Sequence, residues 1–277
     1  MAGGHHGAVQ PPKLVASDVD GTLLGVGDRP SNRTRAVLAR MTAAGVPLVL
    51  ATGRPPRWVP VVSEAVGGGA LVVAANGAVL YDASADRVLA AETIDPPHLD
   101  EVVAGLREAI PGCGIAVERA AVGVGASGEQ FLAESAFEHA WPDADHTEVA
   151  PGELTPEPAV KVLARHRTLT SDVMADAARR AVGHLVDVTF SSSGGLVECS
   201  RRGVTKATGL ARAAAELGVA REDVVAFGDM PNDLAMLRWA GHGVGMANAH
   251  PDVLADVDEV TASNLSDGVA SVLERWF

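Results

Sequence analysis

Cysteines, aromatic residues and long apolar runs are all scarce in this sequence of 277 residues. The two cysteines, Cys113 and Cys199, are too few and too far apart for a zinc site or a disulfide framework, so we expect two reduced, packed thiols. No run of about eighteen apolar residues occurs, and therefore no membrane span is expected. Residues 1–12 lack the basic and apolar regions of a secretory signal, which predicts a flexible tail and a cytoplasmic protein.

Basic residues are also in deficit, since 22 Lys and Arg residues face 35 Asp and Glu residues. The resulting net charge of -13 argues against a nucleic-acid partner, whose phosphates require a basic surface. A small anion can still be bound if a metal, a lysine and backbone N–H groups are supplied locally. Hydrophobic residues make up 47% of the chain, enough for a buried core in a large domain or in a core with an insert.

The first and last thirds of the chain alternate short apolar runs with helix-like segments, a pattern typical of a parallel α/β sheet. Expected strands are 13–17, 46–51, 71–75, 224–227, 243–246 and 259–261. Expected helices are 31–44, 205–217 and 233–239. Ser31 is the expected N-cap of the first of these helices, and Gly45 its end.

The middle of the chain has a different pattern, which predicts an α+β insert. It contains an expected hairpin of 76–80 with 87–91, strands at 114–118, 159–164 and 187–191, and helices at 97–110 and 171–185. The stretches 82–84 and 191–195 have linker composition, and 141–158 is expected to be a surface loop. We therefore divide the chain into a core domain of 13–83 and 193–277 and a cap domain of 84–192.

Two acidic residues, Asp18 and Asp20, directly follow the first apolar run in the segment Asp18-Val19-Asp20-Gly21-Thr22. Crowded carboxylates raise one another's pKa unless a cation is near, and Mg²⁺ is the usual hard cation where phosphate chemistry follows. An ordinary turn is the alternative interpretation of this segment.

Ligands of open α/β sheets bind beyond the carboxyl ends of the strands, so the residues after the other strands matter as well. Thr52-Gly53-Arg54 follows the second strand, and the segment from Gly228 to Asp233 follows a later one. Lys206 opens the helix just before that later strand. Each fragment alone is a weak signal, but their joint placement predicts a single site.

The segments DVDGT, ATGR, GVTKATGL and GDMPNDLAML, in this order, resemble the four motifs of the haloacid dehalogenase (HAD) superfamily of phosphatases. The insert between the second and third motifs resembles that of its Cof-type members, which carry a C2B cap. The resemblance implies a Rossmann-like, doubly wound parallel sheet with an inserted α+β cap. It also implies a phosphatase acting on a small phosphorylated metabolite, either a sugar phosphate or a phosphorylated cofactor or nucleotide.

The resemblance also implies catalytic and metal-binding roles. Asp18 would be the nucleophile that forms an aspartyl-phosphate, and Asp20 the general acid and base. Mg²⁺ would be held by the carboxylates of Asp18 and Asp229 and by the main-chain carbonyl of Asp20. Ion pumps of the superfamily have a threonine at the position of Asp20, so an acid there favours rapid turnover of the phosphoenzyme.

The remaining motif residues would bind the phosphate. Thr52, Gly53, Lys206 and Asn232 would contact the transferring phosphoryl group, and Asp233 would orient Lys206 or a metal-bound water.

Several alternatives stay open at this point. A phosphomutase would use the same residues, and a non-catalytic protein that binds a phosphorylated ligand would need the metal and lysine but not the acid at position 20. Arg54 and Asn76 could each touch the substrate or brace a loop. Of the insert, the possible substrate contacts Glu118, Arg119, Arg165 and His166 cannot be ranked, and the oligomeric state is open.

One further pattern, residues 123–128, has the letters of a dinucleotide-binding fingerprint. It lies inside the insert with no parallel βαβ context, so we expect a flexible loop there.

Overall fold

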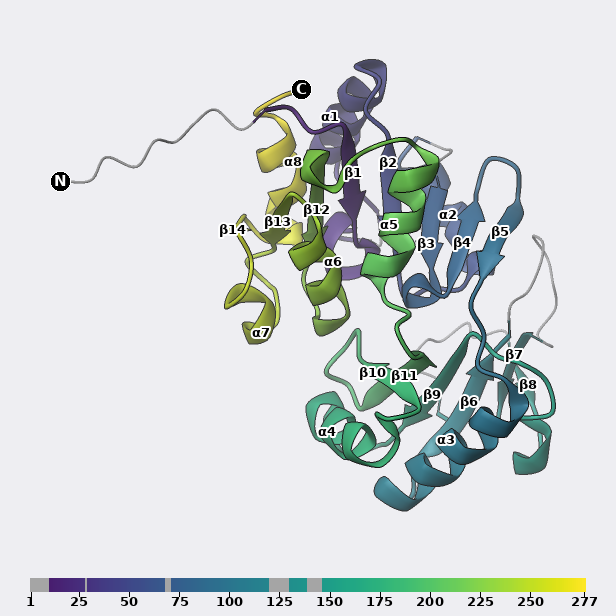
Figure 1. Cartoon of the computed structure of the whole chain (residues 1–277). Helices are drawn as coiled ribbons and strands as arrows, with labels where there is room; N and C mark the ends of the chain where they lie inside the picture. Colours follow the sequence, from purple (N-terminus) through teal and green to yellow (C-terminus); the bar gives the residue numbers. More distant parts are fainter. Residues whose placement is uncertain (1–9, 28, 68–70, 120–129, 139–145) are drawn as a thin grey trace.

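The structure, a computed structural model, describes residues 10–27, 29–67, 71–119, 130–138 and 146–277 (Figure 1). The expected tail, apart from its last residues, and the glycine-rich pattern at 123–128 lie outside these ranges. In the described part of the chain, no helix is both long and apolar enough to cross a membrane. Cys113 and Cys199 are both buried and free, as expected.

The larger of two sheets has eight strands and is mostly parallel. Its spatial order is β14 (Glu259–Val260), β13 (His242–Gly245), β12 (Val224–Gly228), β1 (Leu14–Ser17), β2 (Leu48–Ala51), β3 (Leu71–Ala74), β4 (Val79–Asp82) and β5 (Arg87–Ala91). Strands β14 to β3 pair in parallel, and the β4–β5 hairpin extends the sheet antiparallel beyond β3.

Helices cover both faces of this sheet because its strands are apolar on both sides. On one face, Leu14 and Ala16 pack in a cluster with residues of α5 (Lys206–Glu216), α6 (Leu234–Trp239) and α7 (Pro251–Leu254). On the other face, Val15 packs with residues of α1 (Asn32–Ala43), α2 (Val59–Ala65) and α8 (Gly268–Leu273). This arrangement confirms the doubly wound α/β fold.

The smaller sheet has six strands, and the described helices of this unit cover one of its faces. Its order is β10 (Val186–Thr189), β11 (Leu196–Arg201), β9 (Lys161–Arg165), β6 (Gly114–Glu118), β7 (Phe131–Ala133) and β8 (Thr147–Glu148). Helices α3 (Pro96–Ala109) and α4 (Ser171–Val182) pack on the covered face. The sheet lies beyond the carboxyl end of β1 (Figure 1). Its other face lines a cavity shared with the larger sheet.

Most expected elements are present, but several assignments were wrong because they depend on pairing across the sheets. Strand β5 is an edge of the larger sheet, although 87–91 was assigned to the cap, and β11 belongs to the smaller sheet, although 196–201 was assigned to the core. Strand β8 lies within the expected loop of 141–158, where it pairs in parallel with β7. We therefore propose that the chain passes between the two units at 92–95 and at 202–205, rather than at the linker-like stretches.

Gly77 allows the turn after β3 to approach the first turn of α5 closely. Its φ is +102°, and a Cβ at this position would lie 2.0 Å from the carbonyl oxygen of Thr205, the N-cap of α5. This contact fixes the position of Asn76, which precedes Gly77, relative to Lys206, which follows Thr205.

Gly77→Ala should therefore destabilise the protein more than Gly45→Ala. Gly45 also has a positive φ, +81°, but a Cβ there would meet nothing within 4 Å. We expect about 1–2 kcal/mol from backbone strain at Gly45, and about 1–3 kcal/mol more at Gly77 from overpacking. Urea unfolding of both variants tests this, and equal losses would show that the contact with Thr205 is not tight.

Candidate active site

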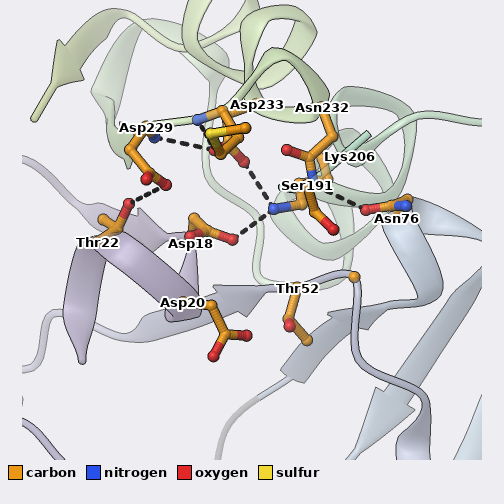
Figure 2. A network of polar contacts seen from close by, with 12 residues as sticks. Asp18, Asp20, Thr22, Thr52, Asn76, Ser191, Lys206, Asp229, Asn232 and Asp233 are labelled. Carbon is orange, nitrogen blue, oxygen red and sulfur yellow. Dashed lines mark hydrogen bonds and ion pairs between the residues drawn. The ribbon is translucent and has the colours of Figure 1, made fainter. Parts of the chain in front are cut away.

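The carboxyl ends of three neighbouring parallel strands converge at one point of the larger sheet. Ser17 at the end of β1 is in register with Phe227 of β12 and with Leu50 of β2. The residues that follow these strands therefore lie side by side, and they include Asp18, Thr52 and Asp229 (Figure 2). All three side chains are buried.

Lys206 joins two carboxylates in the buried centre of this site. Its Nζ donates to Asp18 Oδ1 at 2.5 Å and to Asp233 Oδ1 at 2.6 Å, and its side chain is fully buried. The other oxygen of Asp233 accepts hydrogen bonds from the backbone N–H groups of Asp229 and Met230, both at 3.0 Å. Asp233 thus orients both the lysine and the backbone that follows β12.

Asp229 is held by residues of the turn after β1 and by a later loop. Thr22 Oγ1 donates to Asp229 Oδ1 at 3.1 Å, and Asn248 Nδ2 donates to Asp229 Oδ2 at 3.4 Å as well as to the main-chain oxygen of Gly21 at 2.9 Å. Gly21 has a φ of +83°, and a Cβ there would lie 2.3 Å from Asp229 Oδ2, so only glycine fits. Thr22 and Asn248 were not predicted as site residues, although Thr22 is part of the DVDGT segment.

Asp20 points away from the lysine cluster and pairs with Arg54. Arg54 donates from Nε to Asp20 Oδ2 at 2.9 Å and from its terminal nitrogen to Oδ1 at 2.5 Å. The Asp20 side chain is 52% exposed, and both residues line the same cavity. Arg54 therefore holds the Asp20 carboxylate at the wall of the cavity.

Asn76 and Asn232 connect the phosphate-binding candidates to each other. Asn232 Nδ2 donates to Asn76 Oδ1 at 3.0 Å, and the backbone N–H of Asn76 donates to the carbonyl oxygen of Thr52 at 3.0 Å. Asn76 has a φ of +57° and is buried, so it braces the turn rather than reaching into solvent.

Two buried oxygens of the site, Asp18 Oδ2 and Asn232 Oδ1, have no hydrogen-bond partner among the described residues. An unsatisfied buried carboxylate oxygen is costly and points to a bound cation or ligand. Carboxylate oxygens of Asp18, Asp229 and Asp233 lie within 4.8 Å of one another, a spacing that suits a metal ion. The residues present therefore fit a metal site.

Burial and mutual repulsion raise the pKa of two of these carboxyl groups. Burial raises the pKa of Asp18 well above its usual range, with further increases from Asp233, Asp229 and Asp20, while Lys206 opposes them. Burial and then Asp233 raise the pKa of Asp229 to about 7. Burial opposes the charge of Lys206, but Asp18 and Asp233 raise its pKa above the usual value, so the ammonium is retained. A cation at this site would stabilise the ionised acids.

A cavity of about 590 Å³ opens over these residues between the two sheets. Its walls include Asp18, Asp20, Arg54 and Asp229 from the larger unit and Phe131, Lys161 and Glu198 from the smaller one. The volume is in the range of sites for small metabolites. Lys161 and Glu198 were not predicted, because neither lies in a recognisable motif.

Of the four unranked insert residues, only Glu118 lines this cavity. It forms an ion pair with Arg57 across the two units. Arg119 pairs with Glu157, and Arg165 and His166 line a separate depression.

Residues 15–273 match the family described as haloacid dehalogenase-like hydrolase. The chain is 28% identical to the phosphatase YwpJ of Bacillus subtilis, with 95% of this chain and 99% of the relative covered. It is 27% identical to the 5-amino-6-(5-phospho-D-ribitylamino)uracil phosphatase YcsE of the same organism, with 95% of each covered. The solved structure of a haloacid dehalogenase-like hydrolase from B. subtilis superposes with a TM-score of 0.78 at 26% identity, covering 96% of this chain and all of the other.

Without a bound cation, the protein should be more stable at about pH 5 than at about pH 7.5. The pKa of an unfolded aspartate is about 3.9 and that of Asp229 in the native protein is about 7. Between these values the native state binds more protons than the unfolded state, so the free energy of unfolding falls as the pH rises. Urea unfolding of chelator-treated protein measures this loss.

Asp229→Asn is the control for this effect, because the amide does not ionise. Its free energy of unfolding should fall less between the two pH values than that of the parent. Equal pH dependence in the two proteins would contradict the raised pKa of Asp229.

Proposed function

Because the chain belongs to the haloacid dehalogenase-like hydrolase family and is a phosphoric monoester hydrolase, we propose that it is a Mg²⁺-dependent phosphatase acting on a small phosphorylated metabolite through an aspartyl-phosphate on Asp18. One observation carries this proposal. Asp18 lies at the cavity, with one oxygen fixed by Lys206 and the other buried without a hydrogen-bond partner in the described parts of the chain. A restrained, incompletely satisfied carboxylate is suited to attack a phosphorus atom.

In the first step, an oxygen of Asp18 forms a bond to phosphorus while the bond from phosphorus to the leaving alcohol oxygen breaks. Asp20 delivers a proton to that oxygen, and later removes one from the water that hydrolyses the aspartyl-phosphate. Asp20 stands apart from the buried cluster, at the cavity wall, and its hydrogen bonds with Arg54 must loosen when the carboxyl group delivers the proton. Lys206 and the Thr52 hydroxyl stabilise charge on the transferring group.

Mg²⁺ would be held by the carboxylates of Asp18 and Asp229 and by the main-chain carbonyl of Asp20. The ion would reduce repulsion between Asp18 and a dianionic phosphate and help to align the two. Asp233 also lies in the acidic cluster, but its two oxygens already accept from Lys206 and from two backbone N–H groups. We therefore assign Asp233 the positioning of Lys206 rather than a place as a metal ligand.

The substrate class is a sugar phosphate or a phosphorylated cofactor or nucleotide. The cavity of about 590 Å³ has room for such a molecule, and Trp58 and Phe131 give it aromatic walls. One relative is named as a 5-amino-6-(5-phospho-D-ribitylamino)uracil phosphatase.

Asp18→Asn should abolish phosphate release from a panel of phosphorylated metabolites. The loss should be at least about 10,000-fold, because an amide is a poor nucleophile and the group cannot be replaced by its neighbours. The matched control is Asp223→Asn, because Asp223 precedes β12 at the opposite end of the strand from Asp229 and does not line the cavity that contains Asp18. Full turnover by Asp18→Asn would rule out the proposed nucleophile.

The same assay distinguishes the two alternative functions. A phosphomutase would release little free phosphate and would depend on a bisphosphate activator. A non-catalytic binder would release none and would bind phosphorylated ligands equally well after Asp20→Asn.

Asp20→Asn should reduce turnover by about 100- to 10,000-fold while retaining metal affinity. The acid and base are lost, but the main-chain carbonyl proposed to bind Mg²⁺ is kept. Asp229→Ala should instead weaken Mg²⁺ binding, which calorimetry measures. Equal losses of Mg²⁺ affinity in the two variants would contradict the assignment of Asp20 as a main-chain ligand.

A further inference from the structure

A buried ion pair on the smaller sheet faces the candidate active site. Lys161 on β9 and Glu198 on β11 are 4% and 3% exposed, and Lys161 Nζ donates to Glu198 Oε2 at 2.5 Å. Ser191 Oγ donates to the other carboxylate oxygen at 2.7 Å. Both charged residues line the cavity that contains Asp18.

Both members of this pair also contact the larger unit. Lys161 Nζ donates to the carbonyl oxygen of Gly53 at 2.7 Å, and Asn76 Nδ2 donates to Glu198 Oε2 at 3.1 Å. The ammonium and the carboxylate therefore dock on the two segments that carry Thr52 and Asn76. The ion pair therefore does more than join two strands of the smaller sheet, because it also forms hydrogen bonds with the larger unit.

The contact with Gly53 continues to the side chain of Thr52. The Gly53 carbonyl and the Arg54 N–H belong to one peptide group, and this N–H donates to Thr52 Oγ1 at 3.0 Å. An ammonium on the carbonyl polarises the peptide and strengthens its N–H as a donor. Because Thr52 Oγ1 then accepts this hydrogen bond, its own proton is directed elsewhere and is available to a phosphoryl oxygen.

We propose that Lys161 is a positioning residue for phosphoryl transfer, which acts from the smaller sheet through the Gly53–Arg54 peptide on the hydroxyl of Thr52. Glu198 fixes the Lys161 ammonium in place. This inference rests on the proposed function, because it assigns Thr52 to the transferring group. Under this proposal, the phosphate-binding turn that carries Thr52 is complete only when the two units are closed on each other.

The energetics of the pair support this role. Taking two charges out of water is expensive, and a buried pair is often no more stabilising than apolar residues of similar volume. On the same face of the sheet, Leu163 and Phe131 show that apolar residues do occupy such positions. Burial opposes ionisation of Glu198, but Lys161 and Ser191 lower its pKa, so the carboxylate is charged beside Lys161.

The test begins with Lys161→Met, which keeps the length of the side chain and removes the ammonium. We expect kcat to fall about 10- to 100-fold, the usual effect of removing a group that orients a site residue, with a smaller change in KM. The loss should be equal for p-nitrophenyl phosphate and ribose 5-phosphate, because the effect is on the phosphoryl group. Arg165→Met, at the other end of the same strand, is the matched control and should leave kcat unchanged.

A double-mutant cycle with Thr52→Val decides whether Lys161 acts through Thr52. If it does, adding Lys161→Met to Thr52→Val should reduce kcat by no more than about twofold further. Losses that multiply, or a loss in Lys161→Met that differs strongly between the two substrates, would overturn the proposal. The second outcome would make Lys161 a direct contact of the leaving group.

A second variant and a second measurement cover the cases in which Lys161→Met does not fold or the parent is inactive. If Lys161→Met does not fold, Lys161→Met combined with Glu198→Gln removes the pair without leaving a lone buried charge, and it should show the same loss of kcat. If the parent turns over neither these two substrates nor any other phosphorylated metabolite of the panel, the proposed function fails by itself. The cycle is then measured as affinity for inorganic phosphate, where multiplicative losses would still overturn the positioning role.

Discussion

The buried ammonium of Lys206 is the interaction on which the site depends. It joins Asp18, at the end of β1, to Asp233, which follows β12, and it is completely shielded from solvent. Asp229 adds a further buried carboxylate, so the lysine alone does not balance the acids around it. The burial that raises the pKa of Asp18 and Asp229 therefore also favours the binding of a cation. The Asp18 oxygen that accepts no hydrogen bond from any described residue is available to bind it.

Two units of the fold contribute residues to the site. The larger sheet supplies the acids and the lysine from adjacent strand ends, where parallel pairing brings them together. The smaller sheet supplies a charged pair and aromatic surface on its uncovered face, opposite α3 and α4. The hydrogen bond from Lys161 to Gly53 links the two, so the proposed chemistry depends on closure as well as on the residues of the larger sheet.

The sequence was sufficient to predict that the segments after the core strands gather at one edge of the larger sheet. Asp18 and Asp229 lie in short segments after apolar runs, and the parallel order of the strands brings such segments together, while Lys206 reaches them from the start of α5. Lys161 and Glu198 could not be predicted, because their partners are distant in the sequence and only the pairing of β9 with β11 brings them to one face. For the same reason, the sequence does not indicate that β11 joins the smaller sheet, since its local pattern does not reveal its pairing partners.

The central claim is that the phosphoryl group passes through Asp18. The most direct measurement is mass spectrometry of peptides from Asp20→Asn enzyme, quenched in acid during turnover of p-nitrophenyl phosphate with Mg²⁺. The account predicts a phosphorylated peptide that contains Asp18 and loses its phosphoryl group on treatment with hydroxylamine, as an acyl phosphate does. A phosphoryl group on another residue would contradict the account. Phosphate release without any phosphorylated peptide would also contradict it, provided that the variant is shown to hydrolyse its phosphoenzyme slowly enough for the intermediate to accumulate.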